Sequence, residues 1–536
     1  HTNLYLNWKN DILYSLKDII ALPKNPANVA EALAGEHKDL WEKAITKELD
    51  QFRIRKTFGT AEQAGRGMKT KLILYYKYDG EYNLVCKARL VVCGYSQRKG
   101  IDYFDTYSPT TTTTTVFILL CMGGLMRSHV GSFDISAAFL EGRSDTKMFA
   151  WLPCDIDNDS VSRRIEILGN WYGSKQAGKI WNDLFHSIVV TMGFVQSIDN
   201  PCLYKWTFHA EYIYLTVHVD DGLFIISSKA VAHEFFTELL KHVRKAVMYD
   251  TVQLYLGMDI TRSEDGSMFQ ISQERYIVEA CEGYTRNYHT PMTPSTNLRI
   301  AEPNEANNSL LPDTGKLRYL ADRTRPDILV ALGEVSTGGA ERPSDDHISV
   351  MERMKGYLLN TKQRTLSLGG EGPIKLFGYC DAAYISTGNC KSRLGSCLFI
   401  NYNSGAISSV SKNDTTVSHS STEPEIKAID MICREIVYLR SLLEFLGHKQ
   451  LEPTRIHVDN KSAIELCRTL KVRHNVRHIN VRINYIRELI NARVIELVFV
   501  PGVDNVADVL TKALIKEAHV RHTEVLLHGH KHNART

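Results

Sequence analysis

The stretch that decides the fold is EYIYLTVHVDDGLFIISS, at residues 211–228. Two strand-like runs, EYIYLTV and GLFIIS, flank the turn HVDDG, and this pattern predicts a β-hairpin. Asp220 and Asp221 place paired negative charge beside Gly222 at the turn. Like charges this close repel each other unless a cation neutralises them. The turn is therefore either a solvated loop, the commoner case for an isolated Asp-Asp pair, or one side of a cation site.

A third carboxylate lies upstream in a matching position. Asp134 ends the strand-like run GSFD and precedes ISAAFLEG. We expect it to converge with Asp220 and Asp221 at one sheet edge. Mg²⁺ prefers such hard oxygen ligands and keeps sites for water and phosphate oxygens. Two ions about 4 Å apart would hold an attacking 3′-hydroxyl and a leaving pyrophosphate in line, so the pattern favours nucleotide transfer.

A second set of acids lies at element ends in the C-terminal part. Its members are Asp381, Glu425, Asp459 and Asp508. Acids roughly 35–50 residues apart, each at the end of a different element, are what a two-metal phosphodiester hydrolase requires. Each one taken alone is more often an ordinary cap, because Asp and Glu are common at helix starts and after strands.

Composition limits the class of protein. A length of 536 residues suggests about three or four domains. Lys and Arg (64) nearly balance Asp and Glu (61), so any nucleic-acid-binding surface must be local. The 11 cysteines contain no Cys-x-x-Cys pair, which favours reduced thiols over disulfides or zinc. The longest apolar run, near 116–126, is too short for a membrane span. The start shows neither a signal peptide nor an initiator Met and fits an excised piece.

Local patterns predict the N-terminal elements. Residues 36–52 predict an amphipathic helix. Its apolar face comprises Leu40, Trp41, Ile45 and Leu49. Residues 69–107 are typical of strands around a hairpin turn at Asp79-Gly80. The threonines at 110–115 give little support for a helix.

Strands and helices follow each other again from about residue 371. Three strands precede a helix at 422–446, and strands then alternate with helices, one of them near 480–491. A final helix is expected from Asp504. This order indicates an α/β or α+β domain. The His-rich, basic residues after 514 are expected to be a disordered end.

Ordered motifs give the chain a family resemblance. It resembles the reverse transcriptase–RNase H region of Pol polyproteins from copia-type (Pseudoviridae) LTR retrotransposons, from about residue 28 to 514. The matching pieces include KARLVVCGYSQRKGIDYFDTYSP (87–109), FDISAAFLEG (133–142), WYGSKQAGKIW (171–181), HVDDGLFI (218–225), GYCDAAY (378–384), SSTEPEIKAI (420–429), HVDNKSAIEL (457–466) and VPGVDNVADVLTK (500–512).

The resemblance implies an α+β multidomain fold. A right-hand polymerase of fingers, palm and thumb would be followed by a connection and an RNase H-like α/β domain. The implied parts are an N-terminal linker (1–35), fingers, palm and start of the thumb (36–300), thumb and connection (301–372), the RNase H-like domain (373–514) and a His-rich basic tail (515–536).

The resemblance also implies roles for the acids. It makes Asp134, Asp220 and Asp221 the catalytic palm carboxylates. It makes Asp381, Glu425, Asp459 and Asp508 the RNase H quartet, with Glu423 as a competitor for Glu425. Each set would bind two Mg²⁺ ions, for which Mn²⁺ is a substitute.

Four further residues match nucleotide-contact positions of the family. Lys87 and Arg89 would grip the triphosphate, as a point charge and a fork of donors respectively. Phe139 would be the steric gate against a ribose 2′-hydroxyl, and Gln176 would border the nucleotide pocket.

The implied activity is RNA- and DNA-templated DNA synthesis with RNase H cleavage of RNA–DNA hybrids. The implied partners are an RNA template, a DNA primer, RNA–DNA hybrid, dNTPs and other Pol and Gag products, with no membrane. The implied location is a cytoplasmic virus-like particle, with nuclear entry as a further implication. The sequence leaves the oligomeric state and the primer open.

Departures from the family pattern keep alternatives open. His218 stands where Tyr is usual, and Ser174 and Gly178 replace Leu and Pro. No implied metal ligand is changed. The alternatives are an inactive or domesticated fragment that binds nucleic acid as a scaffold, and an RNase H with a degenerate polymerase.

Overall fold

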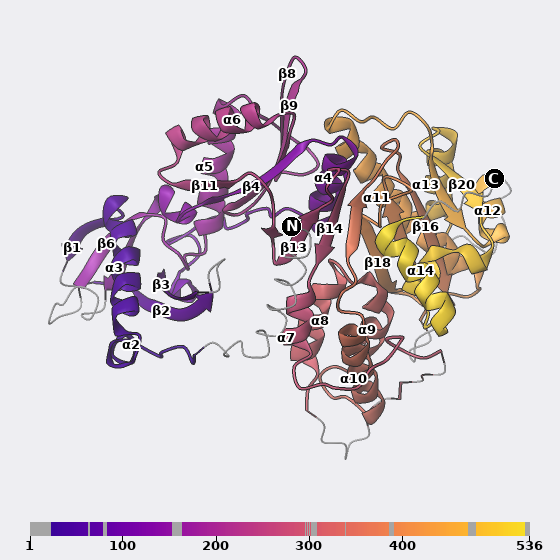
Figure 1. The fold of residues 1–536 in the computed structure, drawn as a ribbon, viewed down its shortest axis with the longest axis horizontal. Coiled ribbons are helices and arrows are strands. Elements are labelled where there is room, and N and C mark those ends of the chain that lie inside the picture. Colours follow the sequence, from indigo (N-terminus) through magenta and orange to yellow (C-terminus); the bar gives the residue numbers. More distant parts are fainter. Residues whose placement is uncertain are drawn as a thin grey trace, which may run out of the picture. The chain divides into compact units, whose positions relative to one another are not determined.

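The computed structural model shows a chain that mixes helices and sheets (Figure 1). It describes residues 23–62, 65–78, 83–152, 163–294, 296, 298–299, 301, 308–337, 339–384, 391–469 and 479–530. These residues form two compact units. Unit 1 contains the described residues up to 109 with 135–192 and 239–246, and unit 2 contains 110–134, 193–238 and the described residues from 247 onward. The expected α+β class is confirmed.

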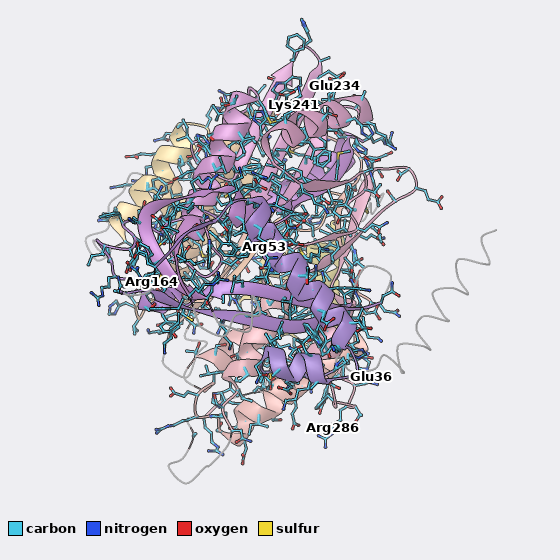
Figure 2. All side chains as sticks on the ribbon, turned by 90° about the vertical axis from the view of Figure 1, so that its left-hand side faces the viewer. Glu36, Arg53, Arg164, Glu234, Lys241 and Arg286 are labelled. Carbon is cyan, nitrogen blue, oxygen red and sulfur yellow. The ribbon has the colours of Figure 1, made fainter. Side chains whose placement is uncertain are left out.

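Unit 1 is built on a five-stranded sheet. In sheet order its strands are β1 (Phe58–Glu62), β6 (Arg163–Gly169), β5 (Arg143–Leu152), β2 (Met68–Tyr78) and β3 (Leu84–Val92). β2 and β3 are antiparallel partners, and the predicted turn at Asp79-Gly80 lies outside the described residues. Arg164 of β6 is labelled in Figure 2. Its guanidinium carbon lies 3.6 Å from the ring centroid of Phe149.

Helices pack on the sheet of unit 1. They are α2 (Val29–Ala34), α3 (Lys38–Ile54) and α5 (Ala177–Thr191). The predicted amphipathic helix is α3, and Trp41 is buried in the core with Ile45 and Leu49. The prediction was wrong for Leu40, which is 40% exposed, because a neighbour in sequence points about 100° away around a helix.

The strand prediction for 69–107 holds only as far as Val92. The chain then forms the 3₁₀ turn η2 (Gly94–Ser96) and continues without a strand, apart from an isolated bridge between Lys99 and Tyr103. Alternating apolar residues thus end where a loop begins.

The first sheet of unit 2 carries the hairpin of residues 211–228. In sheet order its strands are β11 (Ala246–Tyr249), β4 (His129–Ile135), β10 (Asp221–Ile226), β9 (Glu211–His218), β8 (Leu203–Phe208) and β7 (Val195–Gln196). The predicted hairpin is confirmed as the antiparallel pair β9–β10. Helix α6 (Lys229–His242) follows β10.

Helix α4 (Thr113–Leu125) begins inside the threonine run, so the expectation of little helical support there was wrong. The Thr112 hydroxyl accepts a hydrogen bond from the Thr115 backbone N–H at 3.2 Å and caps the helix. Burial of the following apolar residues, Val116 to Met122, then stabilises it.

A small sheet and a helical layer follow in unit 2. The sheet consists of β12 (Leu254–Tyr255), β13 (Met258–Arg262), β14 (Met268–Ser272) and β15 (Leu366–Gly369). The helices are α7 (Glu274–Ala280), α8 (Leu311–Ala321), α9 (Leu329–Ser336) and α10 (Asp345–Asn360). β14 precedes these helices and β15 follows them, and the two strands pair in one sheet.

The third sheet of unit 2 combines antiparallel and parallel pairing. Its strands are β18 (Ser408–Asn413), β17 (Arg393–Phe399), β16 (Phe377–Ala383), β19 (Thr454–Val458) and β20 (Ile495–Phe499). The first three pair antiparallel, and β16, β19 and β20 pair in parallel. Its helices are α11 (Thr422–Phe445), α12 (Lys461–Arg468) and α13 (Asn480–Asn491). The predicted order is confirmed through β20.

The C-terminal end differs from the prediction. Instead of one helix from Asp504, the chain forms the 3₁₀ turns η7 (Gly502–Asp504) and η8 (Val506–Leu510) and then helix α14 (Lys516–His528). The expected disordered end is wrong for α14, because His519 and His522 are both buried. The implied domain boundaries remain predictions. None of the helices in the described ranges has the length and apolarity that crossing a membrane requires.

A fully buried ion pair lies between α8 and α9. Arg325 donates to both carboxylate oxygens of Asp327, at 3.0 and 2.8 Å, and Tyr357 of α10 also donates to Asp327. Neither charged side chain has any exposed surface.

We expect Asp327→Asn to lower the free energy of unfolding by about 3–5 kcal/mol, because it leaves the Arg325 charge buried without its partner. The measurement is urea denaturation followed by circular dichroism. The matched control is Asp322→Asn, which removes the exposed pair with Arg318 and should cost less than about 1 kcal/mol. Equal unfolding midpoints for the two variants would contradict the importance of the buried pair.

Candidate catalytic centres and nucleotide-contact residues

The first centre lies on the hairpin β9–β10 and its neighbour β4. Asp134 of β4 and Asp221 of β10 are directly opposite each other in the antiparallel register. Side chains at such positions share one face of the sheet. Asp220 precedes Asp221 in the turn, where Val219 has a left-handed φ of 63°. The structure therefore brings the three predicted carboxylates to one sheet edge.

Electrostatics confirm that these carboxylates are neighbours. Burial, followed by the charges of Asp220 and Asp134, raises the pKa of Asp221 to about 6. The Tyr255 hydroxyl donates to the main-chain oxygen of Asp221 at 3.2 Å and supports the strand end. A half-buried carboxylate beside two others is the arrangement that a cation would stabilise.

Gly222 is required by packing. A Cβ atom at this position would lie 2.2 Å from the Phe133 ring, which is 1% exposed. Because Gly222 has no side chain, the Phe133 ring of β4 can pack against β10 at this position. The glycine that marks the turn in the sequence therefore serves the strand pairing that aligns Asp134 with Asp221.

The second centre is tighter. Asp381 is the last buried residue of β16, Asp459 follows β19 and Asp508 lies in η8. One carboxylate oxygen from each lies within 4.8 Å of the others. Among the described residues this is the one set of three acidic, His or Cys side chains gathered so closely. The carboxylate oxygens of Asp134, Asp220 and Asp221 do not all lie within 4.8 Å of one another.

Glu425 belongs to the second centre, and Glu423 does not. Burial, followed by the charges of Asp381 and Asp459, raises the pKa of Glu425 to about 9. Its Oε2 is buried and accepts no hydrogen bond from the described residues. In contrast, Glu423 accepts from the His419 backbone N–H at 2.9 Å and pairs with Lys427 at 2.8 Å. The geometry therefore selects Glu425.

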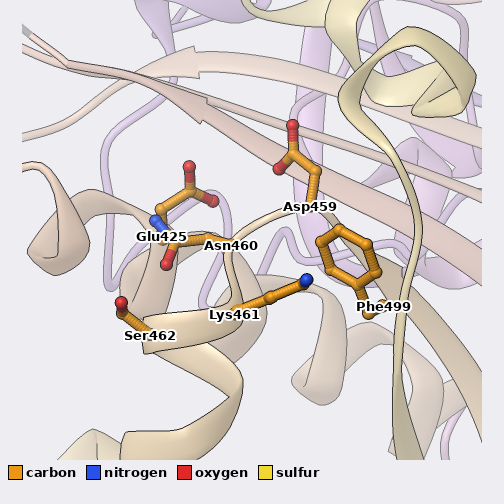
Figure 3. Close-up of a pocket in the computed structure, with 6 residues that line it drawn as sticks. All are labelled: Glu425, Asp459, Asn460, Lys461, Ser462 and Phe499. Atoms are coloured by element: carbon orange, nitrogen blue, oxygen red, sulfur yellow. The ribbon is translucent and has the colours of Figure 1, made fainter.

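An open pocket of about 440 Å³ leads to this centre (Figure 3). Its lining residues are Glu425, Asp459, Asn460, Lys461, Ser462 and Phe499. The Asn460 side chain caps α12, and the Lys461 ammonium lies 4.5 Å from the centroid of the Phe499 ring. The pocket thus combines the carboxylates of Glu425 and Asp459 with the Lys461 ammonium.

The second centre fits a divalent cation. Its donors are carboxylate oxygens, which Mg²⁺ and Mn²⁺ prefer, and one of them is buried without a partner among the described residues. Burial and Asp381 raise the pKa of Asp508 to about 7. A cation would relieve this crowding of negative charge.

Sequence reasoning missed Lys512 and Thr511. The Lys512 ammonium lies 2.9 Å from Asp508 Oδ1 and 3.9 Å from Asp381 Oδ2, so it offsets part of the charge of the second centre. The Thr511 hydroxyl donates to Asp381. The spacing of four residues between Asp508 and Lys512 was the available signal, because such pairs meet on one side of a helical turn.

The nucleotide-contact candidates lie in unit 1. The Arg89 guanidinium lies 4.8 Å from the centroid of the Tyr172 ring, whose centroid is 5.5 Å from that of Phe139. Tyr172, another residue that sequence reasoning missed, thus links two of the predicted residues. Lys87 is two positions before Arg89 on β3 and therefore points to the same face. Burial and nearby lysines lower the pKa of Lys87.

Gln176 has an interior position. Its side chain is fully buried, donates to the Asp102 main-chain oxygen at 3.1 Å and accepts from Gln97 at 2.9 Å. The side chain therefore supports the neighbouring loop. Its implied place beside the nucleotide remains a proposal.

We expect Glu425→Gln to leave the melting temperature in EDTA unchanged or higher, because it removes repulsion with Asp381 and Asp459. The rise in melting temperature that Mg²⁺ gives the parent should be much smaller in this variant. The matched control is Glu423→Gln, two residues away, which should lose about 1–3 kcal/mol of unfolding free energy by weakening the Lys427 pair. Differential scanning fluorimetry with and without Mg²⁺ measures both. A full Mg²⁺ response in Glu425→Gln would remove this residue from the site.

Comparisons with known proteins show what the chain is similar to. Residues 60–295 match the family model "Reverse transcriptase (RNA-dependent DNA polymerase)". The chain is 29% identical over 514 residues to the retrovirus-related Pol polyprotein from transposon TNT 1-94 of Nicotiana tabacum, covering 92% of this chain and 38% of that protein. It is 28% identical over 528 residues to that from transposon RE1 of Arabidopsis thaliana, covering 94% of this chain and 35% of that protein.

The chain thus spans little more than a third of these relatives. A solved foamy viral protease–reverse transcriptase in complex with double-stranded DNA is 13% identical, with a TM-score of 0.47, and covers 86% of this chain and 83% of that one. Residues 60–295 are thus similar to the reverse transcriptase family, and most of the chain is similar to part of the Pol polyproteins of two plant transposons.

Proposed function

We propose that the chain is an RNA- and DNA-templated DNA polymerase with a second centre that hydrolyses the RNA strand of RNA–DNA hybrids. The observation that carries the proposal is the gathering of half-buried carboxylates at the first centre and of buried and half-buried carboxylates at the second. Asp134 and Asp221 face each other across a strand pair, and Asp381, Asp459 and Asp508 converge from three separate elements. The family match supports the polymerase half.

Divalent cations, Mg²⁺ or Mn²⁺ as its substitute, would be held by Asp134, Asp220 and Asp221 and by Asp381, Glu425, Asp459 and Asp508, and would supply positive charge at the reacting oxygens. The carboxylates of each centre hold that charge in place. In the second centre, Thr511 orients Asp381 and Lys427 keeps Glu423 out of the site.

The residues of unit 1 would bind the incoming nucleotide. Arg89 and Lys87, on one face of β3, provide a fork of donors and a point charge for a triphosphate. The Phe139 ring, packed against Tyr172, presents a bulky group that a ribose 2′-hydroxyl would meet. Selection of deoxynucleotides over ribonucleotides would then rest on steric exclusion of the 2′-hydroxyl, not on an added hydrogen bond.

The proposed partners are an RNA template, a DNA primer, RNA–DNA hybrid and dNTPs, with other Pol and Gag products of the same element. Recognition of the duplex would rest on phosphate and 2′-hydroxyl contacts and on groove shape. The proposed location is a cytoplasmic virus-like particle with access to the nucleus.

Asp221→Asn should lower primer extension on poly(rA)/oligo(dT) with Mg²⁺ by more than about a hundredfold, comparable to the loss of one electrostatic group in other active sites. It should leave cleavage of a labelled RNA–DNA hybrid unchanged. Asp459→Asn should show the reverse pattern, so each variant is the control for the other. Absence of both activities from the parent would favour the scaffold alternative, and equal activity of parent and variant would remove that residue from its centre.

Phe139→Val should increase incorporation of ribonucleotides relative to deoxynucleotides by about tenfold or more, because a smaller side chain leaves room for the 2′-hydroxyl. The measurement is single-nucleotide primer extension with dTTP and UTP. The control is Phe208→Val, which shortens an exposed ring on β8 and should leave the ratio unchanged. An unchanged ratio in Phe139→Val would show that another residue excludes ribonucleotides.

A further inference from the structure

Helix α11 extends from the second centre to the sheet that carries the first. Glu425 lies in its first turn, and Phe445 is its last residue. At 1.5 Å per residue, these two residues are about 30 Å apart along the helix axis. The contacts that hold the far end of α11 therefore also influence where Glu425 is placed.

A lysine of the first sheet binds this far end. Lys205 of β8 donates to the Phe445 main-chain oxygen at 2.6 Å, and its ammonium lies 5.0 Å from the centroid of the Phe445 ring. The last carbonyl groups of a helix have no partner within it, and a cation beside them is favourable. Lys205 thus ties the C-terminal end of α11 to β8.

A buried asparagine makes a second connection. Asn200 lies in the turn between β7 and β8. Its amide nitrogen donates to the Thr115 hydroxyl of α4 at 2.7 Å and, at a longer 3.5 Å, to the Tyr438 hydroxyl of α11. Its amide oxygen accepts from the Cys202 backbone N–H at 3.0 Å. One side chain therefore joins the turn to two helices.

The contact residues of α11 lie on one face of the helix. Tyr438, Ser441 and Phe445 are spaced by three and four residues, which places them in line along the helix. The Ser441 hydroxyl donates to Asp199, beside Asn200. This face therefore meets β8 and the preceding turn at three successive points.

The apolar packing around these contacts is shared. Residues of α4, of the hairpin β9–β10 and of α11 belong to one apolar cluster. Such packing stabilises the assembly, but it is non-directional. Hydrogen bonds require a narrow range of distances and angles. The polar contacts are therefore what fixes α11 in one position on the sheet.

Lys205 is connected to the first centre through the sheet. It lies opposite Tyr214 of β9, and β9 pairs with β10, which begins at Asp221. Backbone hydrogen bonds join these strands along their length. A continuous series of hydrogen-bonded elements thus runs from Asp221 through β9 and β8 to α11, and along α11 to Glu425.

We propose that Lys205 and Asn200 are positioning residues that set the separation of the two centres. Together with Tyr438 and Phe445 they form the α11 brace, which holds Glu425 at a constant distance from Asp221. The brace itself does not depend on any activity. Its consequence, which rests on the proposed function, is that the second centre cuts RNA at a defined distance from a primer end bound at the first.

Hydrogen exchange of the full chain in EDTA, measured by mass spectrometry, tests the brace. Lys205→Met removes the charge and should speed exchange of the amides in the last two turns of α11 by about tenfold or more. Amides of α13 should keep the rates of the parent. Lys205→Arg keeps the charge and should exchange as the parent does. The matched control is Lys449→Met, which removes an exposed lysine just beyond the same helix end and should change nothing.

A hybrid substrate tests the consequence. A labelled RNA is annealed to a shorter DNA with a recessed 3′ end and is cut with Mg²⁺ in the absence of dNTPs. The parent should cut within a narrow window of positions from the DNA 3′ end. Lys205→Met and Asn200→Ala should cut over a wider window at an unchanged total rate, because the local contacts of Glu425 remain. Lys205→Arg should restore the narrow window.

Two results would overturn the proposal. One is exchange in α11 that Lys205→Met leaves at the rate of the parent. The other is a Lys205→Met variant that exchanges faster yet cuts within the narrow window of the parent, since the contact would then stabilise the helix end without positioning Glu425. A lower rate at every position without widening would likewise indicate a purely structural role.

Failure of the proposed function would give a different result. Faster exchange in Lys205→Met, with a parent that cuts no hybrid, would uphold the brace and contradict hydrolysis at the second centre. A parent and a Lys205→Met variant that both cut over the same wide window would uphold hydrolysis and contradict the brace.

Discussion

Repulsion between carboxylates is the constraint on which both centres of this protein depend. Burial and neighbouring charges raise the pKa of Asp221 to about 6 and that of Glu425 to about 9. Such groupings are unfavourable by themselves, so the rest of the fold must hold them together. In the proposed function, a cation at each centre would turn this unfavourable arrangement into a binding site.

The two centres are held in different ways. At the first, antiparallel pairing sets Asp134 opposite Asp221, and the missing side chain of Gly222 makes room for Phe133 beneath the strand. At the second, side chains arrive from separate elements, and Lys512 offsets part of their charge. The first arrangement needs correct strand register alone, whereas the second needs the whole C-terminal sheet and its helices to be assembled.

In unit 1 the interior polar contacts matter more than the sequence suggested. Gln176 matched a family position near the nucleotide, yet its amide bonds to Gln97 and to the main chain at Asp102. The same contacts hold the loop of residues 94–107 in place. Tyr172 connects Arg89 with Phe139 through ring contacts, although no sequence pattern pointed to it. Residues that share a motif can therefore serve as support for other residues that meet the ligand.

The sequence by itself determined the elements whose causes are local. Alternating apolar residues predicted β9 and β10, helical spacing predicted α3, and the strand and helix order from β16 to β20 followed from the same periodicities. Motif order then indicated the family and most of the acids. Only the tertiary structure showed which of Glu423 and Glu425 lies in the second centre. It also showed that α14 packs with its histidines buried and that Lys512 pairs with Asp381. These outcomes depend on contacts between residues far apart in the chain, and neither spacing nor composition contains that information.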